Sequence, residues 1–141
     1  MIFTEIKGDL FTVEPEFYMA HCISRDYALG KGIAKEFNKR FHLSSILRRE
    51  NRDEKYTCIL CGKVFNLVTK KRYFNKPTYD SLFSSLIEMR TMCRKLEVKK
   101  LAMPRIGCGL DKLSWSKVRD MIKDVFKNDD IEIRIYYNRE W

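Results

Sequence analysis

The sequence predicts a single α/β domain in which helices cover both faces of a mixed central sheet. Short apolar runs alternate with longer stretches in which apolar residues recur every three or four positions, a pattern typical of alternating strands and amphipathic helices. The chain has 141 residues, 45% of them hydrophobic, which is enough for one packed core. It contains no repeats and no linker rich in proline and glycine, so we expect one domain over residues 1–141.

Six short segments are predicted to be strands. The second is apolar almost throughout, which is typical of a strand covered on both faces of a sheet. The third and fourth lie close together and are joined by a predicted tight turn. The predicted strands lie at residues 2–6, 17–22, two within 56–69, 101–104 and 131–135.

Three segments with helical spacing separate these strands. Ile33, Phe37 and Phe41 recur every four residues and predict the first helix. Thr78 and Ser114 are expected to be the N-caps of the other two helices. The predicted core faces are Leu82, Leu86, Met89, Cys93 and Leu96 in the second helix and Val118, Met121, Ile122, Val125 and Phe126 in the third.

The charge of the chain favours anionic partners without selecting one. The net charge is +9, from 28 basic and 19 acidic residues, and the basic residues are dispersed along the chain. Dispersed positive charge favours contact with phosphates in general rather than recognition of a nucleic-acid sequence. No apolar run is long enough to cross a bilayer, and the first residues lack a secretory pattern. We therefore expect an intracellular protein of the nucleus and cytoplasm with no membrane partner.

The five cysteines fit a reducing compartment, because their number is odd and a chain of this length needs no disulfides. Cys58 and Cys61 have the spacing of half a zinc knuckle. The sequence has no second pair of this spacing, and in a strand the two side chains would face opposite sides of the sheet. We therefore expect no metal site.

Two glycine-bearing loops, residues 24–34 and 105–111, follow predicted buried strands. In sheets of this kind, ligands bind beyond the carboxyl ends of the strands. Glycine lets the backbone approach a ligand closely, and the N–H groups at the start of a helix bind phosphate. The first loop has neither the Walker spacing nor the third glycine of a dinucleotide site. On spacing alone, a diphosphate cradle and a pair of ordinary turns both stay open.

Several motifs taken together resemble those of the macrodomain family. The resemblance covers nearly the whole chain and is strongest to one branch, the terminal ADP-ribose protein glycohydrolases. Two blocks are specific to that branch, Thr69-Lys70-Lys71-Arg72 and the segment from Pro104 to Asp111. The other motifs are Lys7-Gly8-Asp9-Leu10, Ala20-His21-Cys22-Ile23-Ser24, Gly30-x-Gly32-Ile33-Ala34 and Lys76-Pro77-Thr78-Tyr79.

This resemblance implies a three-layer α/β/α macrodomain whose cleft binds ADP-ribose without a cofactor. Asp9 would accept a hydrogen bond from the adenine amino group, beside the backbone of Leu10. Tyr136 and Asn138 would flank the adenine or its ribose, and Ser24 would lie beside the ligand. The diphosphate and the distal ribose would be held by Gly30, Gly32, Ile33, Arg105, Ile106, Gly107, Cys108, Gly109 and Leu110.

The resemblance also implies an enzyme in which Lys70 is the nucleophile and Asp111 its acid/base partner. It would remove mono-ADP-ribose from glutamate and aspartate side chains and deacylate O-acyl-ADP-ribose. Considered without the resemblance, Lys70 is one lysine in a charged run and Asp111 a turn residue. Two alternatives remain, a reader module that binds ADP-ribose without cleaving it and a nucleic-acid-binding protein. The expected partners of this monomer are ADP-ribose, ADP-ribosylated proteins, ADP-ribosylated nucleic acid and poly-ADP-ribose.

Overall fold

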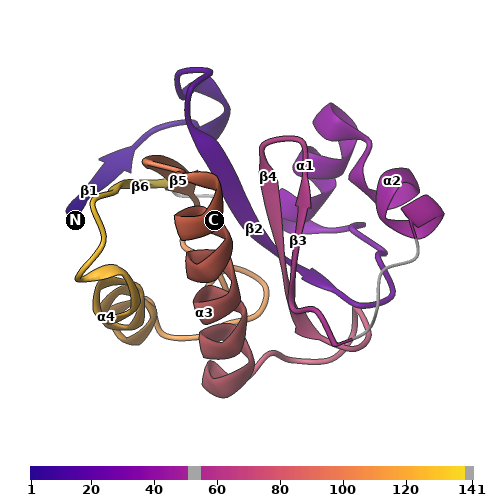
Figure 1. Cartoon of the computed structure of the whole chain (residues 1–141). Coiled ribbons are helices and arrows are strands. Elements are labelled where there is room, and N and C mark those ends of the chain that lie inside the picture. The colour runs from indigo at the N-terminus through magenta and orange to yellow at the C-terminus, as the bar shows by residue number, and fades with distance from the viewer. Residues whose placement is uncertain (51–54, 139–141) are drawn as a thin grey trace.

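A computed structural model of the chain describes residues 1–50 and 55–138, which form one six-stranded sheet with helices on both faces (Figure 1). The strand order is β1-β6-β5-β2-β4-β3, and neighbouring strands are parallel except for the hairpin of β3 and β4. The mixed sheet of the sequence prediction is therefore confirmed. The strands are β1 (Ile2–Lys7), β2 (Tyr18–Ser24), β3 (Cys58–Cys61), β4 (Val64–Lys70), β5 (Lys100–Met103) and β6 (Glu132–Tyr137).

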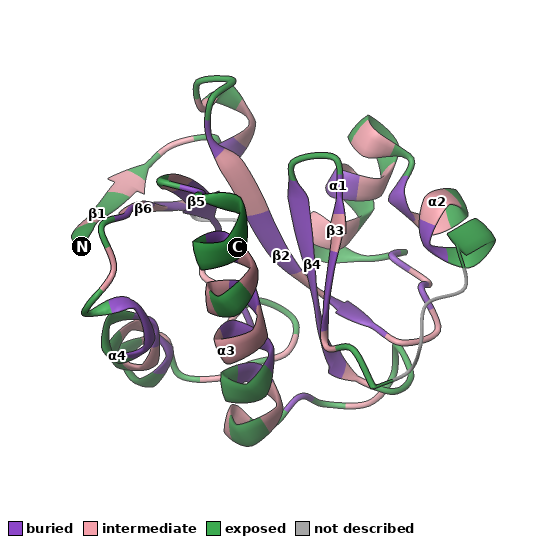
Figure 2. Cartoon of the chain, viewed as in Figure 1, coloured by how far each residue is buried: buried purple, intermediate pink, exposed green. Residues whose placement is uncertain are grey.

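The helices form the two outer layers. Helices α1 and α2 cover one face of the sheet, and α3 and α4 cover the other (Figure 1). Buried residues, purple in Figure 2, line the strands and the sides of the helices that face them. This arrangement confirms the predicted three-layer α/β/α class. The helices are η1 (Leu10–Thr12), α1 (Gly32–Phe41), α2 (Leu43–Glu50), α3 (Tyr79–Leu96) and α4 (Trp115–Phe126).

The predicted helix caps are only partly formed. Thr78 and Ser81 make a capping box at the start of α3, which confirms Thr78 as its N-cap. Ser114 occupies the N-cap position of α4, but its side chain makes no capping bond within the described residues. The prediction that Leu96 faces the core is wrong, because its exposed fraction is 48%. The chain reverses at Glu97, in a left-handed conformation, and Val98 fills the core instead.

The two cysteines with zinc-knuckle spacing lie on opposite faces of the sheet, as predicted. Cys58 packs in the core beneath α3 and α4, whereas Cys61 packs in the core beneath α1 and α2. Among residues 1–50 and 55–138, no group of His, Cys, Asp and Glu side chains is arranged to hold a metal ion. None of the helices described has both the length and the apolar character required to span a membrane.

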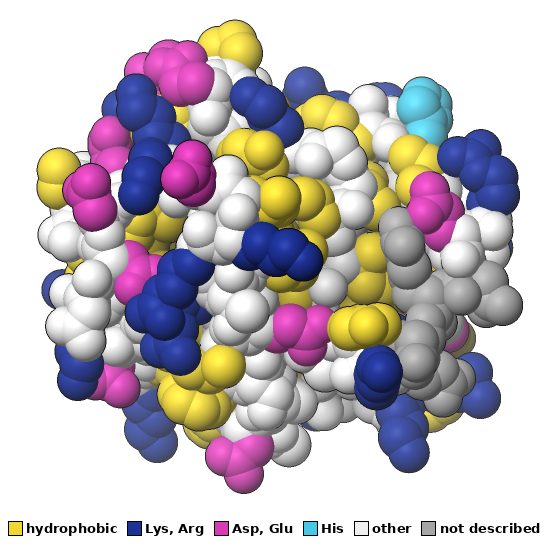
Figure 3. Space-filling model, viewed as in Figure 1, with side chains coloured by type: hydrophobic (Ala, Val, Ile, Leu, Met, Phe, Trp, Pro, Cys, Tyr) yellow, Lys and Arg dark blue, Asp and Glu magenta, His cyan; other side chains and the backbone are white. Residues whose placement is uncertain are grey.

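Positive charge on the face shown in Figure 3 is divided among several groups of side chains rather than gathered into one patch. Acidic and hydrophobic side chains lie between these groups of Lys and Arg (Figure 3). Several cations are already engaged with carboxylates, as Arg94 is with Asp129 at 2.6 Å and Arg134 with Glu14 at 2.7 Å. This face therefore offers attraction to anions without one continuous basic track across it.

Candidate active site

A cleft of about 950 Å³ opens beyond the carboxyl ends of β5, β2 and β4, three adjacent strands of the sheet. This is the edge at which parallel sheets hold their ligands. Both glycine-bearing loops of the sequence contribute to it, and so does the segment after β4. Its lining consists of residues 22–24, 28–34, Lys70, Tyr73, Phe74, Lys76, 104–107 and 109–112.

One wall of the cleft is the start of α1. The N-cap residue, Lys31, makes no side-chain hydrogen bond to the first turn within the described part of the chain. The N–H groups of this turn, which lines the cleft, are therefore available to a ligand. Gly32 has φ +58°, and a Cβ on it would lie 3.2 Å from Leu110 Cδ1 of the opposite loop. Amides at a helix N-terminus bind phosphate, so this wall is suited to an anion.

The basic segment after β4 enters the cleft through Lys70. The register between β2 and β4 passes from Ile23 opposite Val68 to Ser24 opposite Lys70, so Thr69 is the extra residue of a β-bulge. A bulge redirects the side chains that follow it. Lys70 Nζ lies 2.7 Å from Asp111 Oδ1, and the two side chains are only 14% and 18% exposed. The structure thus brings together two residues 41 positions apart, although their catalytic roles stay a prediction.

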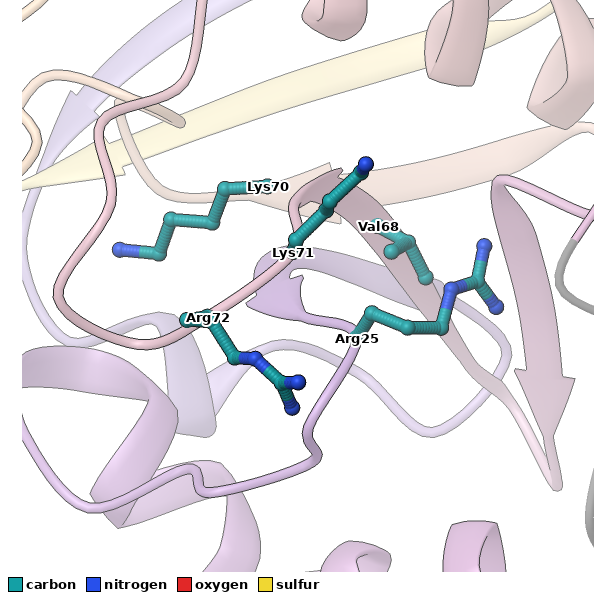
Figure 4. Close-up of a pocket in the computed structure, with 5 residues that line it drawn as sticks. All are labelled: Arg25, Val68, Lys70, Lys71 and Arg72. Atoms are coloured by element: carbon teal, nitrogen blue, oxygen red, sulfur yellow. The ribbon is translucent and has the colours of Figure 1, made fainter.

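The other two cations of this run point elsewhere. Lys71 and Arg72 line a second hollow of about 400 Å³ together with Arg25, Val68 and Lys70, and of these five residues only Lys70 also lines the cleft. In Figure 4 the amine of Lys70 extends away from the ends of Lys71, Arg72 and Arg25. Lys70 is therefore the member of the run that reaches the cleft and Asp111.

Asp26 organises the site, although sequence reasoning did not single it out. Its Oδ1 accepts hydrogen bonds from the Ser24 hydroxyl at 2.5 Å and the Ala28 amide at 3.2 Å, and its Oδ2 accepts from the Tyr73 amide at 2.9 Å. Burial raises the pKa of Asp26, but these hydrogen bonds outweigh burial and hold the pKa below its usual value. The ionised carboxylate therefore joins the first glycine-bearing loop to the segment after β4. An Asp two residues after the strand-ending Ser24 is the signal that could have identified it, because such residues cap turns.

The thiol of Cys22 also lines the cleft, but it is unsuited to attack a substrate. Burial raises its pKa to about 12, and the nearby charges of Asp111 and Cys108 add to the effect. Only the thiolate form of a cysteine is a good nucleophile. The amine of Lys70 is therefore the better candidate for a nucleophile in this cleft.

Five of the predicted binding residues do not line the cleft. Cys108 packs against the core beneath α3 and α4, and its thiol donates to the Ile106 carbonyl at 3.2 Å. The other four follow β1 or belong to β6 and the residue after it, further along the same edge of the sheet. Their predicted contacts with adenine stay a prediction. These four are Asp9, which caps η1 through the Phe11 amide, the buried Leu10 and Tyr136, and Asn138.

Gly107 is expected to be the least replaceable glycine of the second loop. Its φ is +73°, and a Cβ would lie 3.0 Å from Leu113 Cδ1. Gly107→Ala should therefore lower the free energy of unfolding by about 1–2 kcal/mol in urea denaturation. Gly109→Ala is the matched control, because among the described residues no atom beyond its chain neighbours lies within 4 Å of its added Cβ. Equal stability of the two variants would contradict this account.

Comparison with known proteins gives consistent results. No protein-family model matches the chain. Human ADP-ribose glycohydrolase OARD1 is 43% identical over 136 residues, covering 94% of this chain and 90% of that protein. The macrodomain of Mycobacterium tuberculosis DarG superposes with a TM-score of 0.85 at 21% identity, covering 96% of this chain and 97% of that one. DarTG of Thermosipho africanus in complex with ADP-ribose superposes with a TM-score of 0.81 at 19% identity, covering 99% of this chain and 42% of that one. At 21% and 19% identity, these two structural similarities establish the fold alone.

Proposed function

The chain belongs to the macrodomain family, in its branch of ADP-ribose glycohydrolases, and from this premise we propose that it removes mono-ADP-ribose from glutamate and aspartate side chains. The same chemistry would release the acid from O-acyl-ADP-ribose. The observation that carries the proposal is the ion pair of Lys70 and Asp111, 2.7 Å apart in the cleft. A protein that only bound ADP-ribose would have no need of a reactive amine beside a carboxylate.

The cleft supports a definite orientation of ADP-ribose. The diphosphate would lie against the first amides of α1, with the loop of residues 105–111 on its other side. The distal ribose would then reach the amine of Lys70. The adenine would extend along the sheet edge toward Asp9 and Tyr136, at the ends of β1 and β6. Lys31, Lys76 and Lys112 also line the cleft and would offset the diphosphate charge.

Catalysis would begin with transfer of a proton from Lys70 to Asp111, which leaves both groups neutral. Such a transfer becomes easier when a bound substrate excludes water, because burial disfavours the charged forms. The free amine would attack C1″ of the distal ribose, and the bond from C1″ to the carboxylate oxygen would break. The carboxylate would leave with the bonding electrons, and Asp111 would give its proton to solvent.

Hydrolysis of the lysine adduct would complete the cycle. Asp111 would accept a proton from water as the water oxygen attacks C1″, and the bond between C1″ and Lys70 Nζ would break with its electrons returning to nitrogen. The proton on Asp111 would then pass to the amine and restore the ion pair. Each turnover would thus convert one ester and one water molecule into one ADP-ribose, one carboxylate and one proton.

Two measurements test this proposal. Incubation with a peptide carrying glutamate-linked ADP-ribose is expected to release free ADP-ribose. The adduct of Lys70 with C1″ opens its ribose ring to an imine, so borohydride should trap an ADP-ribosyl group that mass spectrometry locates on Lys70. Tight binding of ADP-ribose without release would indicate a reader module instead. Absence of binding would contradict both functions.

A further inference from the structure

The second hollow adjoins the cleft and is lined almost wholly by cations. Of the five residues that line it, four are lysine or arginine and the fifth is Val68. Lys70 lines both cavities, and its amine points toward Asp111 in the cleft and away from the ends of Lys71, Arg72 and Arg25 (Figure 4). A group that leaves the sugar carbon beside this amine is therefore released close to several positive charges.

Two of these charges have no counterion in the protein. Lys71 and Arg72 are exposed, and no carboxylate among residues 1–50 and 55–138 lies within ion-pair distance of either. Asp26 lies within range of the charge of Arg72, but it already accepts three hydrogen bonds. Like charges gathered without a counterion repel each other, and an anion that binds between them relieves the repulsion.

The backbone that carries these two cations is fixed. The Arg72 amide donates to Asn75 Oδ1 at 2.9 Å and the Asn75 amide donates to the Arg72 carbonyl at 3.0 Å, which closes a turn. The Arg25 amide donates to the Lys70 carbonyl at 2.9 Å and so joins the end of β4 to the residue that follows β2. The charges are therefore in place before a ligand arrives, which lowers the entropy lost on binding.

The lining of the hollow favours carboxylates over nucleic acid. None of its five side chains has an aromatic ring on which a base could stack, and the exposed rings of Tyr73 and Phe74 line the cleft instead. The acceptor in the proposed reaction is a carboxylate side chain of a polypeptide. An extended polypeptide covers about 7–10 Å in two or three residues. Acidic residues at those distances from the modified glutamate would bring their carboxylates to the cations of the hollow.

We propose that the second hollow is an acceptor subsite that binds acidic residues two or three positions from the modified glutamate. This inference rests on the proposed hydrolase function and names the class of polypeptide that the same site prefers. Lys71 and Arg72 would attract the flanking carboxylates, while the amine of Lys70 acts on the sugar carbon. Because the interacting groups are exposed, the preference should weaken as the salt concentration rises.

The test uses three peptides that each carry one glutamate-linked ADP-ribose and differ only in the charge of their flanks. Aspartate, asparagine or lysine occupies the second and third positions on both sides of the modified glutamate. At low salt, we expect kcat/KM of the unaltered protein to be roughly 3- to 10-fold higher for the aspartate peptide than for the asparagine peptide. The lysine peptide should be the slowest. The three values should converge at about 0.5 M salt, where exposed charges are screened.

Reversing the charge of the hollow should reverse this preference. Lys71→Glu/Arg72→Glu is expected to turn over the lysine peptide fastest, because its carboxylates attract the lysine flanks and repel the aspartate flanks. A damaged fold or cleft would slow all three peptides together and would not invert their order. Lys71→Arg keeps the charge and should keep the original order.

A matched control makes the same change in net charge at another part of the surface. Lys95→Glu/Lys99→Glu alters two exposed lysines, one in the last turn of α3 and one just before β5, away from the carboxyl ends of the strands. This variant should keep the order shown by the unaltered protein. Turnover of O-acetyl-ADP-ribose, which has no flanking residues, measures the state of the cleft in every variant.

The outcomes separate this inference from the proposed function. No release of ADP-ribose from any peptide by the unaltered protein would overturn the hydrolase itself. Equal kcat/KM values for the three peptides at low salt would overturn the subsite and leave the hydrolase standing, and so would an unchanged order in the charge-reversed variant. If the flanks made no difference and an unmodified single-stranded oligonucleotide inhibited the unaltered protein but not the charge-reversed variant, the hollow would bind nucleic acid instead. That result would also overturn the proposal.

Discussion

Lys70→Arg is expected to reduce turnover of glutamate-linked ADP-ribose by a factor of about 10³ or more while ADP-ribose still binds. Arginine keeps the positive charge and can still pair with Asp111, but a guanidinium stays protonated and cannot attack carbon. The electrostatics of the cleft are thereby preserved and only the nucleophile is removed. Release of ADP-ribose measures turnover, and isothermal titration with ADP-ribose measures binding.

The neighbouring lysine provides the control for this experiment. Lys71→Arg makes the same chemical change one residue along the chain, where the side chain lines the second hollow but not the cleft. We expect its turnover of the glutamate-linked substrate to match that of the unaltered protein. Near-normal turnover in Lys70→Arg would show that Lys70 binds substrate but forms no bond with it. The mechanism would then have to start from a water molecule activated by Asp111.

The sheet could be predicted from local patterns because each strand alternates or is apolar over its own short length. Ile133 and Ile135 of β6 face the same core, as their spacing indicated. Helix α2 was not predicted. It has only eight residues and follows α1 after a single left-handed residue, His42, so its apolar pair Leu43 and Leu47 shows hardly one helical repeat.

The site was harder to predict from the sequence than the sheet, because its contacts join residues that are far apart along the chain. The two glycine-bearing loops could be placed at one edge of the sheet from topology alone. The pairing of Lys70 with Asp111 came from family resemblance, since nothing local marks either residue as reactive. The role of Asp26 depends on the Tyr73 amide 47 positions away, a contact that only tertiary structure creates.

Beneath the cleft, His21 of β2 sits in an environment that accepts only its neutral form. It is fully buried, its ring stacks on Phe37 at 4.1 Å, and its Nε2 lies 2.7 Å from Asn66 Oδ1. The Asn66 amide nitrogen donates to the carbonyls of Ile59 and Val64, so its oxygen must be the acceptor and Nε2 carries the proton. A second proton would go to Nδ1, which is buried and has no partner among the described residues. Burial accordingly lowers the pKa of His21 to about 4.

The stability of the fold should therefore fall as the pH drops from about 6.5 toward 4. In that window the unfolded chain binds a proton at His21 and the folded protein does not, so stability is complete above the unfolded pKa and is lost below it. The loss attributable to His21 should reach about 2–3 kcal/mol near pH 4.5.

Urea denaturation at several pH values measures this loss, with His21→Gln as the comparison because glutamine cannot titrate. The carboxylates of Asp26 and Glu14, whose pKa values are lowered, act at lower pH and are common to both proteins. The folded protein takes up this proton only near pH 4 and below, so His21 should not alter ADP-ribose binding to the folded protein between pH 6.5 and about 5. Equal pH dependence in the two proteins would mean that water or a structural change accommodates the charged ring.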